Sequence, residues 1–141
     1  MMASRESQPG IQRIDAVGPT ALGDAVAATR RFASEQELGT RDRAHLCIIV
    51  EELVANLFDH GDRAGDRRIS VQFDRRDSAI ALVIEDDGPA FDPRSAAANG
   101  EVPARGGGAG LRLVEAWSNV VGYESRDGGN RLDVQVPLID S

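Results

Sequence analysis

The spacing of apolar residues predicts two consecutive helices in the first half of the chain. Residues 19–38 place apolar side chains every three or four positions, which is typical of a helix that ends at Gly39. Residues 40–61 repeat this period, with Thr40 or Asp42 as the expected N-cap. Both segments are amphipathic, so we expect each helix to bury one face.

Alternating and continuous apolar runs predict strands in much of the remainder. Residues 67–75 alternate as a half-buried strand, and residues 78–87 are apolar enough to form a central one. Residues 10–16 fit a short edge strand. Residues 67–75 and 78–87 are predicted to form a hairpin. The helical period returns in residues 109–120, and residues 120–138 are predicted to form a second hairpin.

The order of the predicted elements indicates the fold class. Helices and strands are grouped separately along the chain, which favours an α+β fold: a two-layer α/β sandwich with helices on one face of a mixed, mostly antiparallel sheet. At 141 residues, the chain is predicted to form a single domain over residues 10–141, preceded by a disordered terminus at residues 1–9.

Composition and charge exclude several classes of function. All 16 basic residues are arginine, so there is no P-loop lysine and no lysine nucleophile. The net charge of −7 disfavours nucleic acid and anionic membranes as partners. No segment has the roughly 20 apolar residues that span a bilayer, and no signal peptide is recognisable. With Cys47 as the only cysteine, a buried thiol in a reducing cytoplasm is the simplest expectation.

Polar residues recur at four-residue intervals within the second predicted helix. A step of four residues advances about 40° around a helix, so Glu52, Asn56 and His60 share one stripe. An ordinary solvated face would produce the same pattern. However, Asn is a mediocre helix former, and an amide oxygen one turn from a carboxylate suits a magnesium site in which the carboxylate orients or deprotonates a hydroxyl. The spacing alone leaves both interpretations open.

The predicted central strand ends abruptly in polar residues, Asp86 and Asp87, followed by Gly88. A carboxylate at such a strand end can accept a hydrogen bond from an exocyclic amine such as that of adenine, and glycine lets the chain pass close to a flat ring. Asp, Gly and Pro are also turn formers. A plain strand-terminating turn therefore explains the segment equally well.

A cluster of glycines precedes the third predicted helix, at Gly106, Gly107, Gly108 and Gly110. Unobstructed N–H groups at a helix N-terminus suit phosphate oxygens. The cluster lacks the Lys-Ser/Thr of a P-loop and follows a long loop, not a strand, so neither a P-loop nor a dinucleotide fingerprint fits. Loops as long as residues 88–110 usually act as lids or binding loops. A flexible linker is the alternative.

Together and in this order, the three segments resemble the N box and the two glycine boxes of the GHKL (Bergerat-fold) ATP-binding superfamily. That superfamily includes gyrase, heat-shock chaperone, histidine-kinase and mismatch-repair ATPases. Three spaced motifs are far more specific than any one of them. The short single-domain form, with "DDGPAFDP" as its first glycine box, most resembles the anti-sigma-factor serine kinases of bacterial partner-switching systems. The resemblance spans roughly residues 10–138 and implies the Bergerat fold.

The resemblance implies a role for each matched residue. Asn56 would coordinate the magnesium ion that bridges the triphosphate, Glu52 would be the catalytic base, and Asp86 would bind the adenine amine. Asn130 and Arg131 stand where many relatives carry threonine near the adenine. The other nucleotide-binding residues that the resemblance implies, with residues 94–107 as the ATP lid, are His60, Gly88, Ala90, Phe91, Arg105, Gly106, Gly107, Gly108, Ala109, Gly110, Leu111 and Asn130.

The implied function is a protein kinase that uses ATP and Mg²⁺ to phosphorylate a serine or threonine of an antagonist (anti-anti-sigma) protein and that also binds a sigma factor. A nucleotide-binding switch without phosphoryl transfer is the alternative. A catalytic domain cut from a histidine kinase is disfavoured, because the only histidines, His45 and His60, lie in one predicted helix. A plain α+β interaction domain is the remaining alternative. Relatives often form homodimers, and the sequence leaves that state open.

Overall fold

Five strands form one sheet in the order β1-β2-β3-β5-β4. The computed structural model describes residues 10–59, 68–88, 109–126 and 128–139. Every neighbouring pair of strands in this sheet is antiparallel, so the sheet is antiparallel throughout and not mixed. The strands are β1 (Ile11–Val17), β2 (Arg68–Arg75), β3 (Ala79–Asp86), β4 (Asn119–Arg126) and β5 (Gly129–Pro137).

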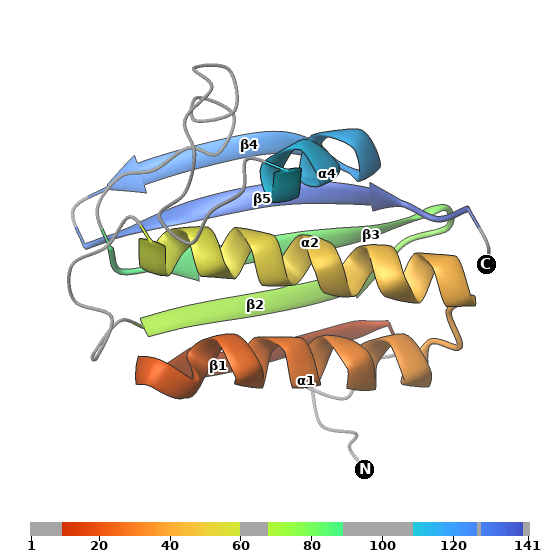
Figure 1. Ribbon diagram of the computed structural model, residues 1–141, viewed down its shortest axis with the longest axis horizontal. Coiled ribbons are helices and arrows are strands. Elements are labelled where there is room, and N and C mark those ends of the chain that lie inside the picture. Colours follow the sequence, from red (N-terminus) through yellow and green to blue (C-terminus); the bar gives the residue numbers. More distant parts are fainter. Residues whose placement is uncertain (1–9, 60–67, 89–108, 127, 140–141) are drawn as a thin grey trace, which may run out of the picture.

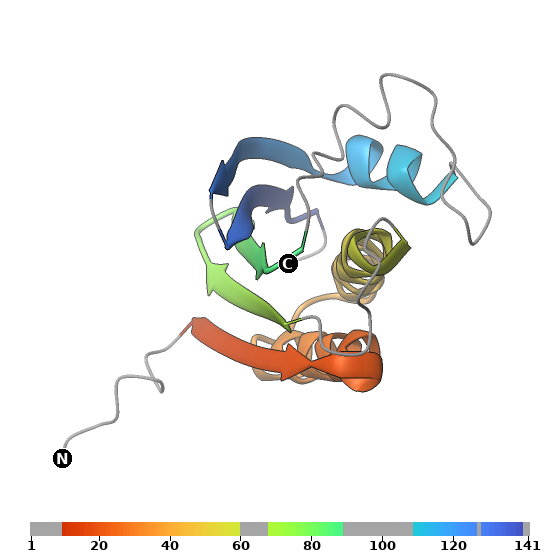
Figure 2. The same ribbon diagram turned by 90° about the vertical axis from the view of Figure 1, so that its left-hand side faces the viewer.

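Three α-helices lie on the same face of the sheet (Figures 1 and 2). They are α1 (Ala21–Glu35), α2 (Thr40–Asp59) and α4 (Ala109–Trp117), and a 3-10 turn, η2 (Gly18–Thr20), leads into α1. The predicted two-layer α+β architecture is therefore confirmed. Among the described residues, no helix is both long enough and apolar enough to cross a membrane.

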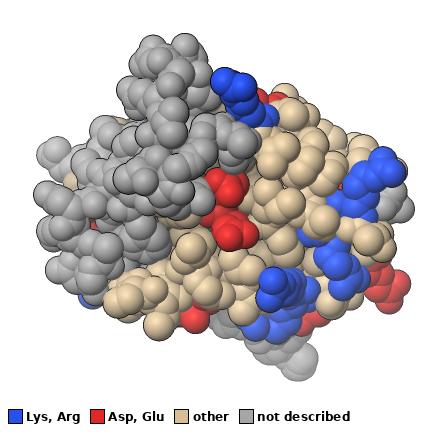
Figure 3. Space-filling view, viewed as in Figure 1, with Lys and Arg blue, Asp and Glu red and all other residues tan. Residues whose placement is uncertain are grey.

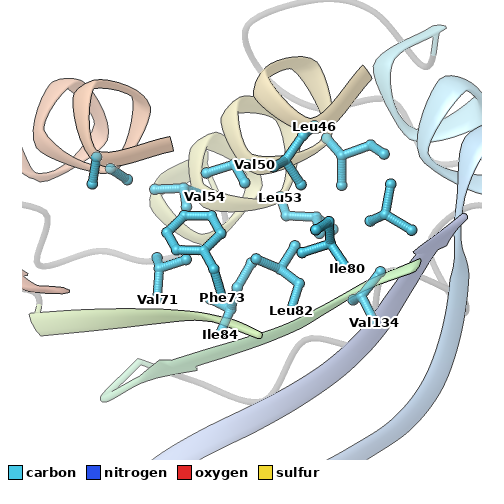
Figure 4. Close-up of a cluster of buried hydrophobic side chains, with 14 of the residues drawn as sticks. Leu46, Val50, Leu53, Val54, Val71, Phe73, Ile80, Leu82, Ile84 and Val134 are labelled. Atoms are coloured by element: carbon cyan, nitrogen blue, oxygen red, sulfur yellow. The ribbon is translucent and has the colours of Figure 1, made fainter. Parts of the chain in front are cut away.

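The core lies between α2 and the sheet (Figure 4). Phe32 of α1 extends it and stacks on Phe73 of β2, with ring centroids 4.9 Å apart. Alternate residues of each strand supply the sheet side, as the predicted alternation in residues 67–75 requires. Figure 4 labels the central members: Leu46, Val50, Leu53 and Val54 of α2, and Val71, Phe73, Ile80, Leu82, Ile84 and Val134 of the sheet.

Helix α1 ends earlier than its apolar period predicts. The backbone N–H of Leu38 donates to the carbonyl of Ala33 at 3.0 Å, and that of Glu37 donates to Ser34 at 3.1 Å. This is the pattern of a helix that closes through one left-handed residue, and Glu37 has a φ of 54°. Because glycine usually fills that position, Gly39 was a misleading signal for the end of the helix.

Neither Thr40 nor Asp42 is the N-cap of α2. The helix begins at Thr40, and the carbonyl of Gly39 before it accepts a hydrogen bond from the N–H of Arg43 at 2.9 Å. The Asp42 side chain is only 2% exposed, and its Oδ1 accepts a hydrogen bond from the N–H of Ile139 at 2.8 Å. Asp42 therefore ties the segment after β5 to the first turn of α2. A favourable cap residue in the sequence was recruited for a tertiary contact that local pattern does not reveal.

The sheet face opposite the helices carries charged side chains in a ladder across the strands. Glu85 lies 3.7 Å from Arg13 on one side and 3.9 Å from Arg131 on the other. These side chains are well exposed, and such pairs typically contribute about 0–1 kcal/mol each. The ladder therefore contributes little to stability.

Cys47 lies half-buried in α2, as expected of a structural thiol. Burial is the main cause that raises the pKa of Cys47, against the opposing charges of Arg30 and Arg43. The thiol is therefore held in its protonated, weakly nucleophilic form at neutral pH.

Strand β5 approaches the end of β3 at a position where only glycine fits. A Cβ atom on Gly129 would lie 2.6 Å from the backbone oxygen of Asp86. That oxygen belongs to the main chain, so it cannot move aside as a flexible side chain would. Gly129 thus permits the close contact that brings β5 against the polar end of β3.

Replacing Val134 by alanine should lower the free energy of unfolding by about 2–3 kcal/mol, because a buried side chain leaves a cavity. Val134 is 1% exposed, whereas Val121 is 58% exposed. The matched Val121→Ala change should therefore stay within about 0.5 kcal/mol of the wild type. Urea unfolding measures both, and equal losses would contradict the assigned core.

Replacing Gly129 by alanine should cost about 1–3 kcal/mol through overpacking against the β3 backbone. Gly23 of α1 is the control, because a Cβ there would meet nothing within 4 Å. Gly23→Ala should leave stability unchanged or raise it by up to about 1 kcal/mol. The close approach would be disproved if both variants unfolded at the wild-type urea concentration.

Candidate functional site

Asp86 ends β3 with its side chain on the helix-covered face, where it is 8% exposed. Its Oδ2 accepts a hydrogen bond from the N–H of Gly88 at 2.8 Å. Its Oδ1 accepts one from Nδ2 of Asn130 at 3.2 Å, because Asn130 lies directly opposite on β5. The fold therefore brings together three residues that the sequence placed in the nucleotide site.

The Asn130 amide uses both of its ends. Nδ2 donates to the carbonyl of Gly88 at 3.0 Å as well as to Asp86, and Oδ1 accepts from the hydroxyl of Tyr123 at 3.0 Å. Tyr123 of β4 was absent from the predicted site. It pairs with Leu132, two residues beyond Asn130, so it belongs to the same sheet face. Strand alternation combined with the hairpin register would have identified it.

Arg131 is separated from Asn130 by the pleat of β5. It lies on the opposite face of the sheet, where Nη2 of Arg131 lies 3.2 Å from Oδ1 of Asp133. That hydrogen bond is the main cause that raises the pKa of Arg131. Of the two residues that replace the threonine of relatives, only Asn130 therefore belongs to this site.

The neighbouring carboxylate, Asp87, has a structural contact of a different kind. Its Oδ1 accepts a hydrogen bond from the N–H of Arg68 at 2.9 Å, and its own N–H donates to the Arg68 carbonyl at 3.2 Å. Asp87 therefore fastens the start of β2 to the end of β3. The acidic pair at the strand end divides into one pocket residue and one anchoring residue.

A narrow pocket separates α2 from the end of the sheet at this point. Its lining is mostly apolar with a few polar groups, which is the usual composition of a small-molecule site. However, its volume of about 10 Å³ is far below the roughly 300–1,000 Å³ of a ligand pocket, so a nucleotide base would have to widen it. Helix α2 contributes the apolar wall that faces the Asp86 carboxylate. The lining residues are Leu53, Leu57, Ile84, Asp86, Tyr123, Asn130 and Leu132.

Asn56 lies in the interior of α2 with a fully buried side chain. Its Nδ2 donates to the backbone carbonyl of Glu52 at 2.7 Å, which orients the amide. Within the described part of the chain, Oδ1 is buried without a hydrogen-bond partner. An unsatisfied buried acceptor costs about 1–3 kcal/mol. An acceptor of this kind is a suitable ligand for a hard cation such as Mg²⁺.

Asn56 lies beside the pocket wall on the helix surface. Leu53 and Leu57 are three residues before and one residue after it, and both line the pocket. Asn56 therefore borders the apolar wall on the side of Glu52. In the described ranges, no group of three or more His, Cys, Asp or Glu side chains forms a metal-binding cluster. The fit to magnesium therefore rests on one amide oxygen, as expected when phosphates supply most of the ligands.

Glu52 is half-buried on α2, one turn before Asn56. Its neighbour Glu51 is exposed. Figure 3 shows acidic side chains at the molecular surface near the middle of α2. Glu52 therefore lies beside Asn56 on the helix surface, and its side chain is closer to solvent than the Asn56 amide.

Helix α4 places its N-terminus on the same side of the sheet as α2 (Figure 1). The helix begins at Ala109, so the first N–H groups, including those of Gly110 and Leu111, have no acceptor within the helix. At the other end, Trp117 stacks on His45 of α2, with ring centroids 3.8 Å apart and planes at 7°. This stack fastens α4 along α2.

Several predicted site residues and segments lie outside the described residues. The sequence-based roles of these positions stay predictions, as do the disordered terminus and the ATP lid. They are residues 1–9, His60, Ala90, Phe91, residues 94–107, Arg105, Gly106, Gly107 and Gly108.

Two solved structures share this fold at low sequence identity. The histidine kinase domain of the blue-light activated histidine kinase from Erythrobacter litoralis EL346 is 14% identical, with a TM-score of 0.51 over 84% of this chain. The chain spans 60% of that domain's length. The catalytic domain of histidine kinase ThkA is 11% identical, with a TM-score of 0.50 over 92% of this chain and 99% of that one. At these identities the likeness concerns the fold alone.

Sequence comparisons give the family. A protein from Bordetella bronchiseptica named serine/threonine-protein kinase BtrW is 29% identical over 123 residues, which cover 82% of this chain and 85% of the relative. The family model described as the histidine kinase-like ATPase domain matches residues 16–136, nearly the whole described fold. This chain therefore belongs to the histidine kinase-like ATPase domain family.

Proposed function

We propose that this protein binds ATP with Mg²⁺ and transfers the γ-phosphoryl group to a serine or threonine of a partner protein. The observation that carries this proposal is the buried, unpartnered Oδ1 of Asn56. A folded protein retains such an uncompensated acceptor most readily where a ligand satisfies it. A histidine kinase-like ATPase domain and a relative named as a serine/threonine kinase support the same assignment.

The base end of the pocket supports adenine as the bound base. Asp86 presents an acceptor carboxylate, held by hydrogen bonds from Gly88 and Asn130. A carboxylate can accept an exocyclic N–H in addition to such bonds. Apolar side chains from α2 and the sheet would contact the faces of the ring.

The phosphate end would use charge neutralisation and positioning more than covalent chemistry. When bound, Mg²⁺ would offset the negative charge of the triphosphate. Asn56 would hold the ion through Oδ1, and the N–H groups at the start of α4 would bind phosphate oxygens. Glu52 would accept the proton of the attacking hydroxyl at its carboxylate.

The protein substrate proposed here is an antagonist of the anti-anti-sigma type, and the second partner is a sigma factor. Support comes from the resemblance of the segment "DDGPAFDP" to the first glycine box of partner-switching kinases. Phosphorylation would add about −1.5 to −2 charge to the antagonist at its contact with this domain. That charge would loosen the complex and leave the domain available to the sigma factor.

Replacing Asn56 by alanine should lower the affinity for Mg-ATP at least about tenfold, because the only amide oxygen proposed to hold the ion is lost. Alanine also removes the hydrogen bond from Nδ2 to the Glu52 carbonyl and empties a buried position, so stability should fall by about 1–3 kcal/mol while the protein stays folded. Isothermal titration calorimetry and urea unfolding measure the two effects. The control is Asn119→Ala, an exposed asparagine of β4. Wild-type Mg-ATP affinity in Asn56→Ala would rule out the ligand role.

Replacing Glu52 by glutamine should leave ATP binding intact and slow phosphoryl transfer by roughly 10²-fold or more, because the proposed base is removed while the shape is kept. Glu51→Gln is the matched control, since it removes the adjacent exposed carboxylate. Labelled ATP and a candidate antagonist are incubated with each variant, and phosphoserine and phosphothreonine are scored. Undiminished transfer by Glu52→Gln would exclude Glu52 as the base. ATP binding without transfer by the wild type would favour a nucleotide-dependent switch.

A further inference from the structure

Three neighbouring strands contribute one side chain each to a hydrogen-bond chain at the base end of the pocket. The Tyr123 hydroxyl of β4 lies 3.0 Å from Oδ1 of Asn130 on β5, and Nδ2 of Asn130 lies 3.2 Å from Oδ1 of Asp86 on β3. Asp86 and Asn130 are 8% and 7% exposed. Water therefore has little access to these contacts, and the protein itself sets the direction of each hydrogen bond.

The chemistry of the groups determines that direction. Nδ2 of Asn130 faces two acceptors, the Asp86 carboxylate and the Gly88 carbonyl. If the amide were turned over, its oxygen would face both acceptors and neither hydrogen bond would form. The Asn130 oxygen is therefore on the side of Tyr123, and the tyrosine hydroxyl donates to it. The two acceptors select this amide orientation, and the Tyr123 hydroxyl stabilises it by donating to the oxygen end.

We infer that Tyr123 is a positioning residue that makes the site prefer purine nucleotides with an exocyclic amine over those with a carbonyl at the same ring position. By fixing the amide of Asn130, it holds the Asp86 carboxylate as a hydrogen-bond acceptor in one place. An amine donates to a carboxylate held in this way, whereas a carbonyl oxygen is repelled by it. This inference rests on the proposed nucleotide binding and adds the group that sets base selectivity.

The tyrosine ring and its hydroxyl have separable roles. The ring is half-buried and packs against the hydrophobic core, and it lines the pocket beside Leu132. Phenylalanine would keep that packing and remove the hydroxyl that donates to Asn130. A change in nucleotide preference in Tyr123→Phe would therefore report the hydroxyl and not the shape of the pocket.

The test compares dissociation constants for Mg-ATP and for Mg-ITP, which carries a carbonyl in place of the amine. The wild type should prefer ATP, and Tyr123→Phe should reduce the ratio of the two affinities about fivefold to tenfold, the effect of one lost hydrogen bond. An unchanged ratio would overturn the inference. An equal loss of affinity for both nucleotides would also overturn it, because that result indicates a general structural role.

A double-mutant cycle with Asn130→Thr tests whether Tyr123 acts through Asn130. Threonine has no amide to orient, so Tyr123→Phe should change the ATP-to-ITP ratio less than about twofold in that background. The same change in both backgrounds would mean that Tyr123 acts independently, and the inference would fail. A wild type that binds neither nucleotide would refute the proposed function and this inference together. A wild type that binds both equally would refute the inference alone.

Discussion

The packing of α2 on the sheet is the constraint on which the rest of the structure depends. Val50 and Val54 are completely buried, and Leu53 is nearly so, which leaves the helix no freedom to rotate about its axis. The fixed orientation of the helix places Asn56 in the interior, although within the described residues its oxygen has no hydrogen-bond partner there. The apolar contacts of α2 offset a local penalty of about 1–3 kcal/mol. The polar stripe that includes Glu52 and Asn56 is thus positioned by the same side chains that form the core.

The alternation of side chains along the strands positions the other half of the proposed site. Because side chains alternate along a strand, Asp86 and Asn130 reach the pocket while Glu85 and Arg131 are directed to the open face. Apolar residues precede Asp86 on its face of β3 and follow Asn130 on its face of β5. The polar network is therefore a direct continuation of the hydrophobic core, and it forms where β3 leaves that core and β5 enters it.

Much of the fold could be predicted from the sequence, because each amphipathic segment has one period and one face to bury. Asn56 and Asp86 could be singled out from the sequence, because the resemblance joined patterns that each had a plain structural explanation, and their roles stay predictions. Tyr123 was missed because its contact with Asn130 depends on the register of β4 against β5, which has to be worked out from the predicted hairpin before the two side chains are seen to share a face. The end of α1 also escaped prediction, because a glutamate there adopts the conformation that usually marks glycine.

The close approach at Gly129 has a consequence for how the chain tolerates insertions and deletions. A shift of one residue in the pairing of β5 with β3 would turn Asn130 to the open face, and a shift in one of the two directions would also bring the larger Asn130 against the Asp86 backbone in place of Gly129. The same shift would move the buried apolar side chains of β5 to the open face of the sheet, so the core would be lost as well. The number of residues in the connection between β4 and β5 is therefore as important to the proposed base-recognition site as the identity of the side chains. Length changes should be tolerated best in segments that do not set strand register.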